Sequence, residues 1–110
     1  RVAHHTRGHN PHSIGVELVN RGRYPDWLDS RCQQMTEAYT PAQIDALLAL
    51  IATLKARCPA LAEIAGHEDL DRTLVPASDD PAIEVRRKRD PGPLFPWDQI
   101  LAATGLRRRM

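Results

Sequence analysis

The feature that most constrains the fold is a helix predicted over residues 40–58. Thr40 and Gln43 have the spacing of a capping box, and Pro41 stands at the first helical position, where proline is tolerated. Apolar residues recur at helical spacing and form one stripe: Ile44, Leu47, Leu48, Ile51 and Leu54. A helix with a single apolar stripe must bury it against another element, so we expect this helix to pack on a sheet.

Length and charge limit the remaining possibilities. A chain of 110 residues is long enough for one domain with a modest core, so we expect residues 1–110 to form a single domain. The formal net charge is only +1, which argues against general attraction to nucleic acid or membranes. Residues 86–89 are four consecutive bases, but acidic residues lie around them. We therefore expect no nucleic-acid partner, and no apolar run is long enough to span a membrane.

Residues 13–20 alternate in the pattern of a strand. Ile14, Val16 and Leu18 would face one side, whereas Glu17 would face the other. A charged side chain among apolar neighbours is costly unless it is paired or used. Glu17 is therefore either a surface carboxylate on an edge strand or a functional group in a cleft.

Two further residues have the chemistry of metal ligands. His67 follows a short apolar run, which predicts a strand over residues 61–66 that ends at this side chain. Asp90 precedes Pro91-Gly92, a turn that can fix its orientation. An imidazole and a carboxylate are two of the three protein ligands that an open zinc site needs. An isolated histidine is more often structural, so both interpretations remain open at this point.

Lys88 lies two residues before Asp90, so both side chains point the same way in an extended segment. A cation there could stabilise a developing oxyanion. For the rest of the chain, we expect a surface excursion over residues 71–85, a short helix over residues 98–103 that Gly105 ends, and a solvated tail at residues 107–109.

Three sequence motifs together resemble a known family. They are Ser-Ile-Gly-Val-Glu at residues 13–17, Gly-His-Glu-Asp at residues 66–69, and Arg-Lys-Arg-Asp-Pro-Gly-Pro-Leu-Phe-Pro-Trp at residues 87–97. The chain resembles the zinc-dependent N-acetylmuramoyl-L-alanine amidases of the amidase-2 type, which are relatives of the peptidoglycan recognition proteins. The resemblance runs through nearly the whole chain. It implies an α/β fold in which a mixed central sheet is flanked by helices and carries a zinc cleft.

The resemblance also implies roles for individual residues. His67 and Asp90 would bind Zn²⁺, and Glu17 would accept a proton from the attacking water. Lys88 would stabilise the oxyanion. The implied reaction is hydrolysis of the amide between N-acetylmuramic acid and L-alanine, in peptidoglycan or in a muropeptide. A non-catalytic peptidoglycan-binding module and an inactive truncated amidase are the alternatives.

Residues 1–12 contain four of the five histidines, a cluster that is either a polar loop or part of a metal site. The resemblance implies that His5 and Asn10 contact the substrate. The family's first zinc-binding histidine lies further upstream, so the chain corresponds to the C-terminal portion of the family fold. The third ligand would come from an upstream segment or a second chain, or else from His4 or His5.

The substrate and the compartment are linked expectations. Few residues follow Trp97, which leaves little room for a wall-binding domain and favours a soluble muropeptide as substrate. A soluble fragment would favour a cytoplasmic location. Intact cell wall as substrate would instead favour a periplasmic or secreted protein.

Overall fold

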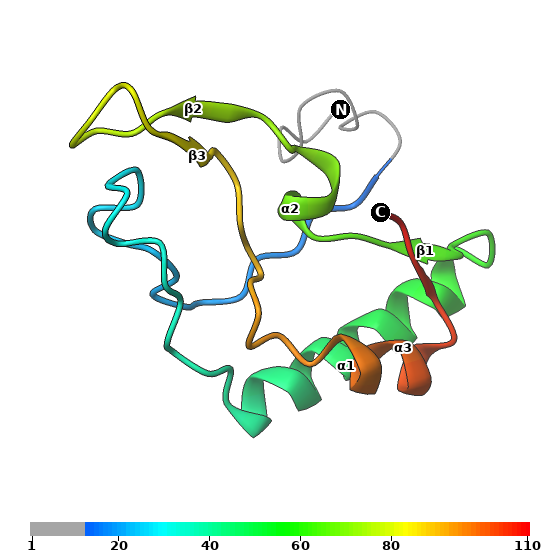
Figure 1. Cartoon of the computed structure of the whole chain (residues 1–110). Coiled ribbons are helices and arrows are strands. Elements are labelled where there is room, and N and C mark those ends of the chain that lie inside the picture. Colours follow the sequence, from blue (N-terminus) through cyan, green and yellow to red (C-terminus); the bar gives the residue numbers. More distant parts are fainter. Residues whose placement is uncertain (1–12) are drawn as a thin grey trace.

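The computed structural model describes residues 13–110, which form an α/β arrangement (Figure 1). The α/β class predicted from the sequence is confirmed at this level. In chain order the elements are α1 (Pro41–Arg57), β1 (Glu63–Ile64), α2 (His67–Leu70), β2 (Leu74–Pro76), β3 (Glu84–Arg86), α3 (Trp97–Thr104) and β4 (Arg107–Arg108). Among these residues, no helix is both long and apolar enough to cross a bilayer.

Helix α1 forms as its sequence predicts. The Gln43 N–H donates to Thr40 Oγ1 at 3.1 Å, and the Thr40 N–H donates to Gln43 Oε1 at 2.9 Å. These two bonds make the capping box, which satisfies N–H groups that the first turn would otherwise leave unpaired. Ile44, Leu47 and Ile51 are the buried residues of the predicted stripe. The helix ends at Arg57, two residues before Pro59.

The core lies where α3 packs against α1 (Figure 1). Its buried side chains are Ile44, Leu47, Ile51, Phe95, Ile100 and Leu106. Ile100 is completely buried, which is the expected position for an apolar residue in the middle of a short helix. Gly105 ends α3 in the left-handed conformation at φ 71°, as the sequence predicts.

The single mixed central sheet is not present among residues 13–110. Two separate two-stranded sheets occur instead: β1 pairs with β4 in parallel, and β2 pairs with β3 antiparallel. The second pair is a hairpin over residues 74–86. The sequence suggested only a surface excursion over residues 71–85. Figure 1 shows this hairpin well away from α1. Among residues 13–110, no strand of one pair is hydrogen-bonded to a strand of the other.

The strand predicted over residues 13–20 is also wrong, because none of these residues belongs to a strand in the described part of the chain. Residues 14–20 make no backbone–backbone hydrogen bond to another described residue, so the ladder that defines a strand is missing. Ile14 and Val16 are exposed, and only Leu18 packs against the core. The segment is fixed instead by side chains, since Gln43 Nε2 donates to the Val19 carbonyl and Asn20 Nδ2 donates to the Glu37 carbonyl.

The solvated tail predicted at residues 107–109 is a third error. Arg107 and Arg108 form β4, whose register places them beside Glu63 and Ile64 of β1. The N–H of Arg109 continues the pairing by donating to the Ile64 carbonyl at 2.8 Å. Three consecutive arginines do not have the composition of a strand, so pairing with β1 rather than local propensity decides this structure.

The hairpin is fastened by an ion pair that gives a testable prediction. Arg87 binds Asp71 through Nε at 3.0 Å and through Nη2, and this hydrogen bonding holds the pKa of Asp71 at about 2. We expect Asp71→Asn to lower the free energy of unfolding at pH 7 by about 1.5–3 kcal/mol, the usual contribution of a hydrogen bond to a charged group. Urea unfolding measures this loss.

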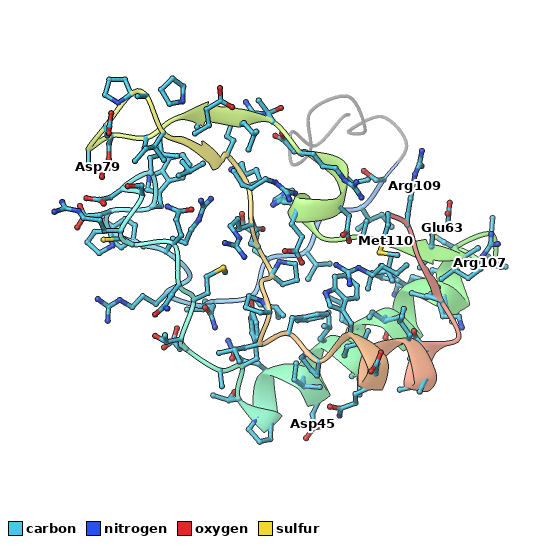
Figure 2. All side chains as sticks on the ribbon, viewed as in Figure 1. Asp45, Glu63, Asp79, Arg107, Arg109 and Met110 are labelled. Carbon is cyan, nitrogen blue, oxygen red and sulfur yellow. The ribbon has the colours of Figure 1, made fainter. Side chains whose placement is uncertain are left out.

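The pH dependence of that loss has a definite sign. A lowered pKa stabilises the fold above the unfolded value near 3.8, and this contribution is lost as the pH falls through about 2. The difference between the parent and Asp71→Asn should therefore shrink between pH 4 and pH 2. Asp45→Asn is the control, because Asp45 is exposed on α1 (Figure 2) and its replacement should change stability by less than about 0.5 kcal/mol. A pH-independent difference would contradict the assignment.

Candidate active site

His67 is the first residue of the single helical turn α2, rather than the last residue of a strand. Strand β1 ends at Ile64, and Gly66 is extended with φ −87° and ψ 162°. The Asp69 carboxylate accepts the Gly66 N–H at 2.9 Å, and the His67 carbonyl accepts the Asp71 N–H at 2.8 Å. These bonds at both ends of the turn fix the backbone that carries the imidazole.

The structure brings His67 and Asp90 into direct contact. His67 Nδ1 lies 2.6 Å from Asp90 Oδ2, with the two side chains 27% and 55% exposed. One backbone bond joins the two segments, since the Glu68 N–H donates to the Asp90 carbonyl at 3.1 Å. The Tyr39 hydroxyl holds the turn after Asp90 by donating to the Pro91 carbonyl at 2.8 Å. The pair therefore lies at the junction of α2 with the turn that follows Asp90.

The electrostatics of this junction favour an ionised carboxylate. Desolvation raises the pKa of Asp90, but the hydrogen bond and charge of His67, with a smaller contribution from Lys88, bring the pKa below its ordinary value. Desolvation also raises the pKa of Tyr39 to about 12, with Asp90 adding to the effect. Asp90 is therefore an anion and Tyr39 a neutral hydrogen-bond donor near pH 7.

These two donors fit the chemistry of zinc, which binds neutral imidazole nitrogen and carboxylate oxygen. Their 2.6 Å separation is that of a hydrogen bond. Two donors about 2 Å from one tetrahedral zinc ion would lie about 3.3 Å apart, so only a small displacement separates the two arrangements. Within residues 13–110, no group of three or more His, Cys, Asp or Glu side chains could hold a metal ion. In the described part of the chain, His67 and Asp90 are therefore a pair of candidate ligands and not a complete set.

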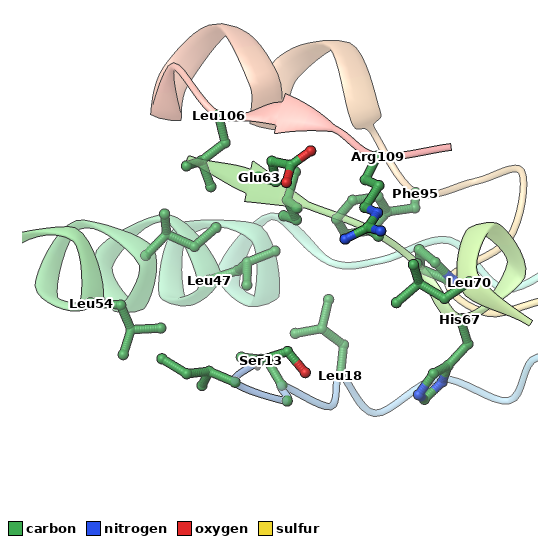
Figure 3. Close-up of a pocket in the computed structure, with 18 of the residues that line it drawn as sticks. Ser13, Leu18, Leu47, Leu54, Glu63, His67, Leu70, Phe95, Leu106 and Arg109 are labelled. Atoms are coloured by element: carbon green, nitrogen blue, oxygen red, sulfur yellow. The ribbon is translucent and has the colours of Figure 1, made fainter. Parts of the chain in front are cut away.

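A groove of about 790 Å³ opens beside this pair (Figure 3). Figure 3 shows His67 at one end and side chains of α1 along its wall, with the segment from Ser13 to Leu18 on the opposite side. The apolar lining includes Leu47, Ile51, Leu54, Leu61, Ile64, Phe95 and Leu106. On the edge of β1 that faces away from β4, no described strand is paired.

The other predicted site residues differ in where they lie. Glu17 is exposed and lines the same groove as His67 and Asp90. Lys88 is exposed and is not part of the groove lining, although its charge acts on Asp90. His5 and Asn10 lie outside the described residues. The structure thus gathers three of the six predicted residues at one groove.

Arg23 supports the segment before Asp90, and sequence reasoning missed it. It is only 8% exposed, and its guanidinium donates to the carbonyls of Arg86 and Arg87 at 2.7 and 3.1 Å and to Gln33 Oε1 at 2.6 Å. Burial is the main cause that lowers its pKa, followed by the charge of Arg89. Arginine in an irregular loop gives no local signal of burial, so nothing in the sequence pattern indicated this role.

Comparison with known proteins identifies the family. Residues 1–93 match the family described as N-acetylmuramoyl-L-alanine amidase. The chain is 38% identical over 92 residues to the N-acetylmuramoyl-L-alanine amidase AmiD of Escherichia coli (strain K12), a match that covers 83% of this chain and 27% of the relative. It is 35% identical over 94 residues to the 1,6-anhydro-N-acetylmuramyl-L-alanine amidase AmpD of Enterobacter cloacae, covering 84% of this chain and 36% of the relative.

The chain therefore spans about a third or less of the length of these two relatives. No solved structure matches it significantly. The family match nevertheless covers far more than half of the chain, and both relatives exceed 30% identity. The amidase-2 resemblance seen in the sequence motifs is thereby confirmed. The chain belongs to the N-acetylmuramoyl-L-alanine amidase family.

Proposed function

We propose that this protein hydrolyses the amide between N-acetylmuramic acid and L-alanine in peptidoglycan or muropeptides, with zinc as its cofactor. The observation that carries the proposal is the contact between His67 Nδ1 and Asp90 Oδ2 at the end of the groove that Glu17 also lines. An imidazole, a carboxylate and a second carboxylate beside one groove are three of the groups that a zinc-dependent hydrolase uses: two metal ligands and a general base. Membership of the amidase family supports the same chemistry.

In this proposal His67 and Asp90 hold the metal. Zinc, when bound, polarises a carbonyl and makes water a better nucleophile. Glu17 accepts a proton from the attacking water and returns it to the leaving amine of L-alanine. Lys88 stabilises the negative charge that develops on the amide oxygen, since an ammonium group favours the charged transition state over the neutral substrate. His5 and Asn10 contact the muropeptide.

The proposal also includes a partner segment for the fold. Residues 1–110 act as the C-terminal portion of the amidase domain, and an upstream segment or a second chain supplies the third ligand. One edge of β1 pairs with no strand among residues 13–110, and an apolar groove lies beside it. Both support this proposal, because an open strand edge next to an apolar wall favours pairing with another strand. The substrate class is a soluble muropeptide and the compartment the cytoplasm. A preference for intact peptidoglycan would favour the periplasm or secretion instead.

A non-catalytic peptidoglycan-binding module is the alternative from another functional class. It would use the same groove but would need neither the imidazole–carboxylate pair nor an exposed Glu17 beside it. An inactive truncated amidase is the second alternative. Retention of both proposed ligands in direct contact favours the enzyme.

The deciding experiment combines zinc stoichiometry with release of the peptide from a purified muropeptide. One zinc ion per chain together with release of an L-alanine-led peptide supports the proposal, whether the chain acts alone or with the upstream segment of a relative added. Binding of muropeptide without zinc and without release, under both conditions, would establish a binding module. Neither zinc nor substrate binding under either condition would establish the inactive amidase.

The two proposed catalytic groups can be separated from the metal ligands. We expect Glu17→Gln to lower kcat by about 10²–10⁴-fold, the usual contribution of general acid–base catalysis. Lys88→Met should lower kcat by about 10²–10³-fold, the usual effect of removing one oxyanion donor. Neither change should alter zinc stoichiometry, since neither residue binds the metal in the proposal. Steady-state kinetics and metal analysis measure both effects.

Glu63→Gln is the matched control for Glu17. Glu63 is also an exposed carboxylate that lines the groove, but it lies on β1 (Figures 2 and 3). Its replacement should leave kcat unchanged within about twofold, since it has no part in the proposed proton transfer. Equal losses in Glu17→Gln and Glu63→Gln would mean that groove charge, rather than proton transfer, governs the rate.

A further inference from the structure

The guanidinium of Arg108 on β4 forms hydrogen bonds with the turn that carries His67. Its Nε donates to Asp69 Oδ2 at 3.0 Å and its Nη2 donates to Asp69 Oδ1 at 2.9 Å. Nη2 also reaches Glu68 Oε1 at 3.3 Å. The guanidinium therefore binds Asp69 through both carboxylate oxygens, the geometry in which arginine–carboxylate pairs are most specific.

The opposite contact of Arg108 is aromatic. Its Cζ lies 4.0 Å from the ring centroid of Trp97, well within the range of a cation–π interaction. Trp97 begins α3 and ends the segment that starts at Asp90. Arg108 thus contacts both chain segments that meet at the candidate site: α2, which carries His67, and the segment from Asp90 to Trp97.

Asp69 connects Arg108 to the backbone around His67. Its side chain is only 6% exposed, and Oδ2 accepts the Gly66 N–H at 2.9 Å in addition to the arginine. The Asp69 N–H in turn donates to the Gly66 carbonyl at 3.0 Å. Two hydrogen bonds therefore join Gly66 to Asp69, on either side of His67. Arg108 neutralises the buried Asp69 carboxylate that makes one of them.

The turn cannot be stable without such support. Helix α2 has only four residues, and none of them is buried as a whole residue. Isolated helices of this length do not persist in water, because the first turn fixes several backbone dihedrals for a single hydrogen bond. External contacts must therefore hold the turn, and the arginine–carboxylate pair is the contact that reaches its N-terminal hydrogen bonds directly.

We propose that Arg108 is a positioning residue for His67. Its guanidinium lies between Asp69 and the Trp97 ring and fixes the α2 turn in the position where the His67 imidazole contacts the Asp90 carboxylate. Its consequence for zinc and catalysis rests on the proposed function. The local geometry does not depend on it, because every contact in this series joins two residues of the chain itself.

The test compares Arg108→Gln, Arg108→Lys and the control Arg107→Gln in the 110-residue chain. Arg107 precedes Arg108 on the same strand, is exposed and projects outward (Figure 2). The first readout is hydrogen exchange of the Gly66 amide without metal, measured by NMR against the Ile51 amide in α1. The second is zinc affinity by competition with a chelator. The first readout reports positioning, and the second its consequence for the proposed function.

We expect Arg108→Gln to raise the exchange rate of the Gly66 amide by about tenfold or more while the Ile51 amide stays unchanged. Zinc affinity should fall by about 10–100-fold, the usual effect of removing a group that orients a ligand. Arg108→Lys should recover only part of both, because lysine keeps the charge but not the planar fork or the ring stacking. Arg107→Gln should change neither.

Two results would overturn the proposal. One is an unchanged Gly66 exchange rate in Arg108→Gln, and the other is an equal rise at Gly66 and Ile51, which would mean a general loss of stability. Failure of the proposed function gives a different result. If the parent chain binds no zinc, either alone or with the upstream segment of a relative added, but Arg108→Gln still loosens Gly66 selectively, the positioning role stands and the metal assignment fails.

Discussion

Replacing His67 with glutamine is expected to remove zinc binding and to lower kcat/KM for muropeptide hydrolysis by at least about 10³-fold. Glutamine keeps a polar side chain of similar length but offers no imidazole nitrogen, and a Lewis-acid metal contributes several kcal/mol to such a reaction. Asp90→Asn should have the same effect, since zinc prefers a carboxylate to an amide oxygen. Metal analysis and steady-state kinetics on both variants measure these losses.

The same substitutions should change stability very little. The His67–Asp90 contact is partly exposed, with more than half of the Asp90 side chain accessible, so the pair contributes at most about 1 kcal/mol to folding. A large loss of activity with a nearly unchanged unfolding midpoint would separate a metal-binding role from a structural one. Asp98→Asn, an exposed carboxylate on α3, is the control for a general effect of lost charge. Full zinc binding in either site variant would refute the ligand assignment.

The elements that local sequence determines were predictable. Helix α1 depends on Thr40, Pro41, Gln43 and a stripe of apolar residues, all within one stretch of chain. The end of α3 depends on Gly105, since a left-handed residue there favours glycine. In both cases the pattern and the structure agree, because the interactions that decide them join residues a few positions apart.

The elements that distant residues determine were not predictable in the same way. Residues 13–20 have the alternation of a strand, but a strand exists only where another strand pairs with it, and none does within the described residues. Arg107 and Arg108 have the composition of a solvated tail, yet they pair with β1 as a parallel strand. Single-sequence patterns specify which face is apolar but not which partner is available.

In the candidate site, too, the residues with a local sequence signal were predictable and the residues that act from a distance were not. His67 and Asp90 were identified by side-chain chemistry and by motifs, and the structure brings their side chains into contact, while their roles as ligands stay predictions. The supports were missed: Arg23 reaches carbonyls more than 60 residues away, and Arg108 reaches Asp69 from 39 residues away. Arginines in a loop and in a basic tail have no periodicity that marks them as anchors. Geometry alone reveals them.

A single methyl group at Gly66 is expected to disrupt the candidate site. A Cβ there would lie 2.4 Å from Pro91 Cδ, 3.1 Å from the Asp90 carbonyl oxygen and 3.3 Å from Trp97 Cζ2. Carbon atoms prefer contacts of about 3.5–4.0 Å, so the Asp90–Pro91 segment must move. The proline ring is closed onto the main-chain nitrogen, so Pro91 Cδ cannot rotate away from the added Cβ. Since Gly66 has φ −87°, alanine suits its backbone and the whole effect is steric.

Gly66→Ala should therefore separate α2 from the Asp90 segment and break the Glu68–Asp90 backbone bond. We expect zinc affinity to fall by at least about tenfold, since the two ligands lie on the two segments that are forced apart. Stability should fall by about 1–3 kcal/mol, the usual cost of overpacking a close contact. Chelator competition and urea unfolding measure the two effects on the same sample.

Gly105→Ala is the matched control, because it adds the same methyl group for a different physical reason. Gly105 has φ 71°, and the nearest atom to a Cβ there is Lys55 Nζ at 3.8 Å, so the strain lies in the backbone and not in a clash. A left-handed alanine costs about 1–2 kcal/mol, comparable with the cost at Gly66. Zinc affinity should nevertheless stay unchanged, because Gly105 lies beside Lys55 and Leu101, which belong to the two long helices and not to α2 or the Asp90–Pro91 segment. Equal losses of zinc affinity in the two variants would show that the site responds to global stability alone, and that the tight packing of Gly66 against Pro91 does not position the two ligands.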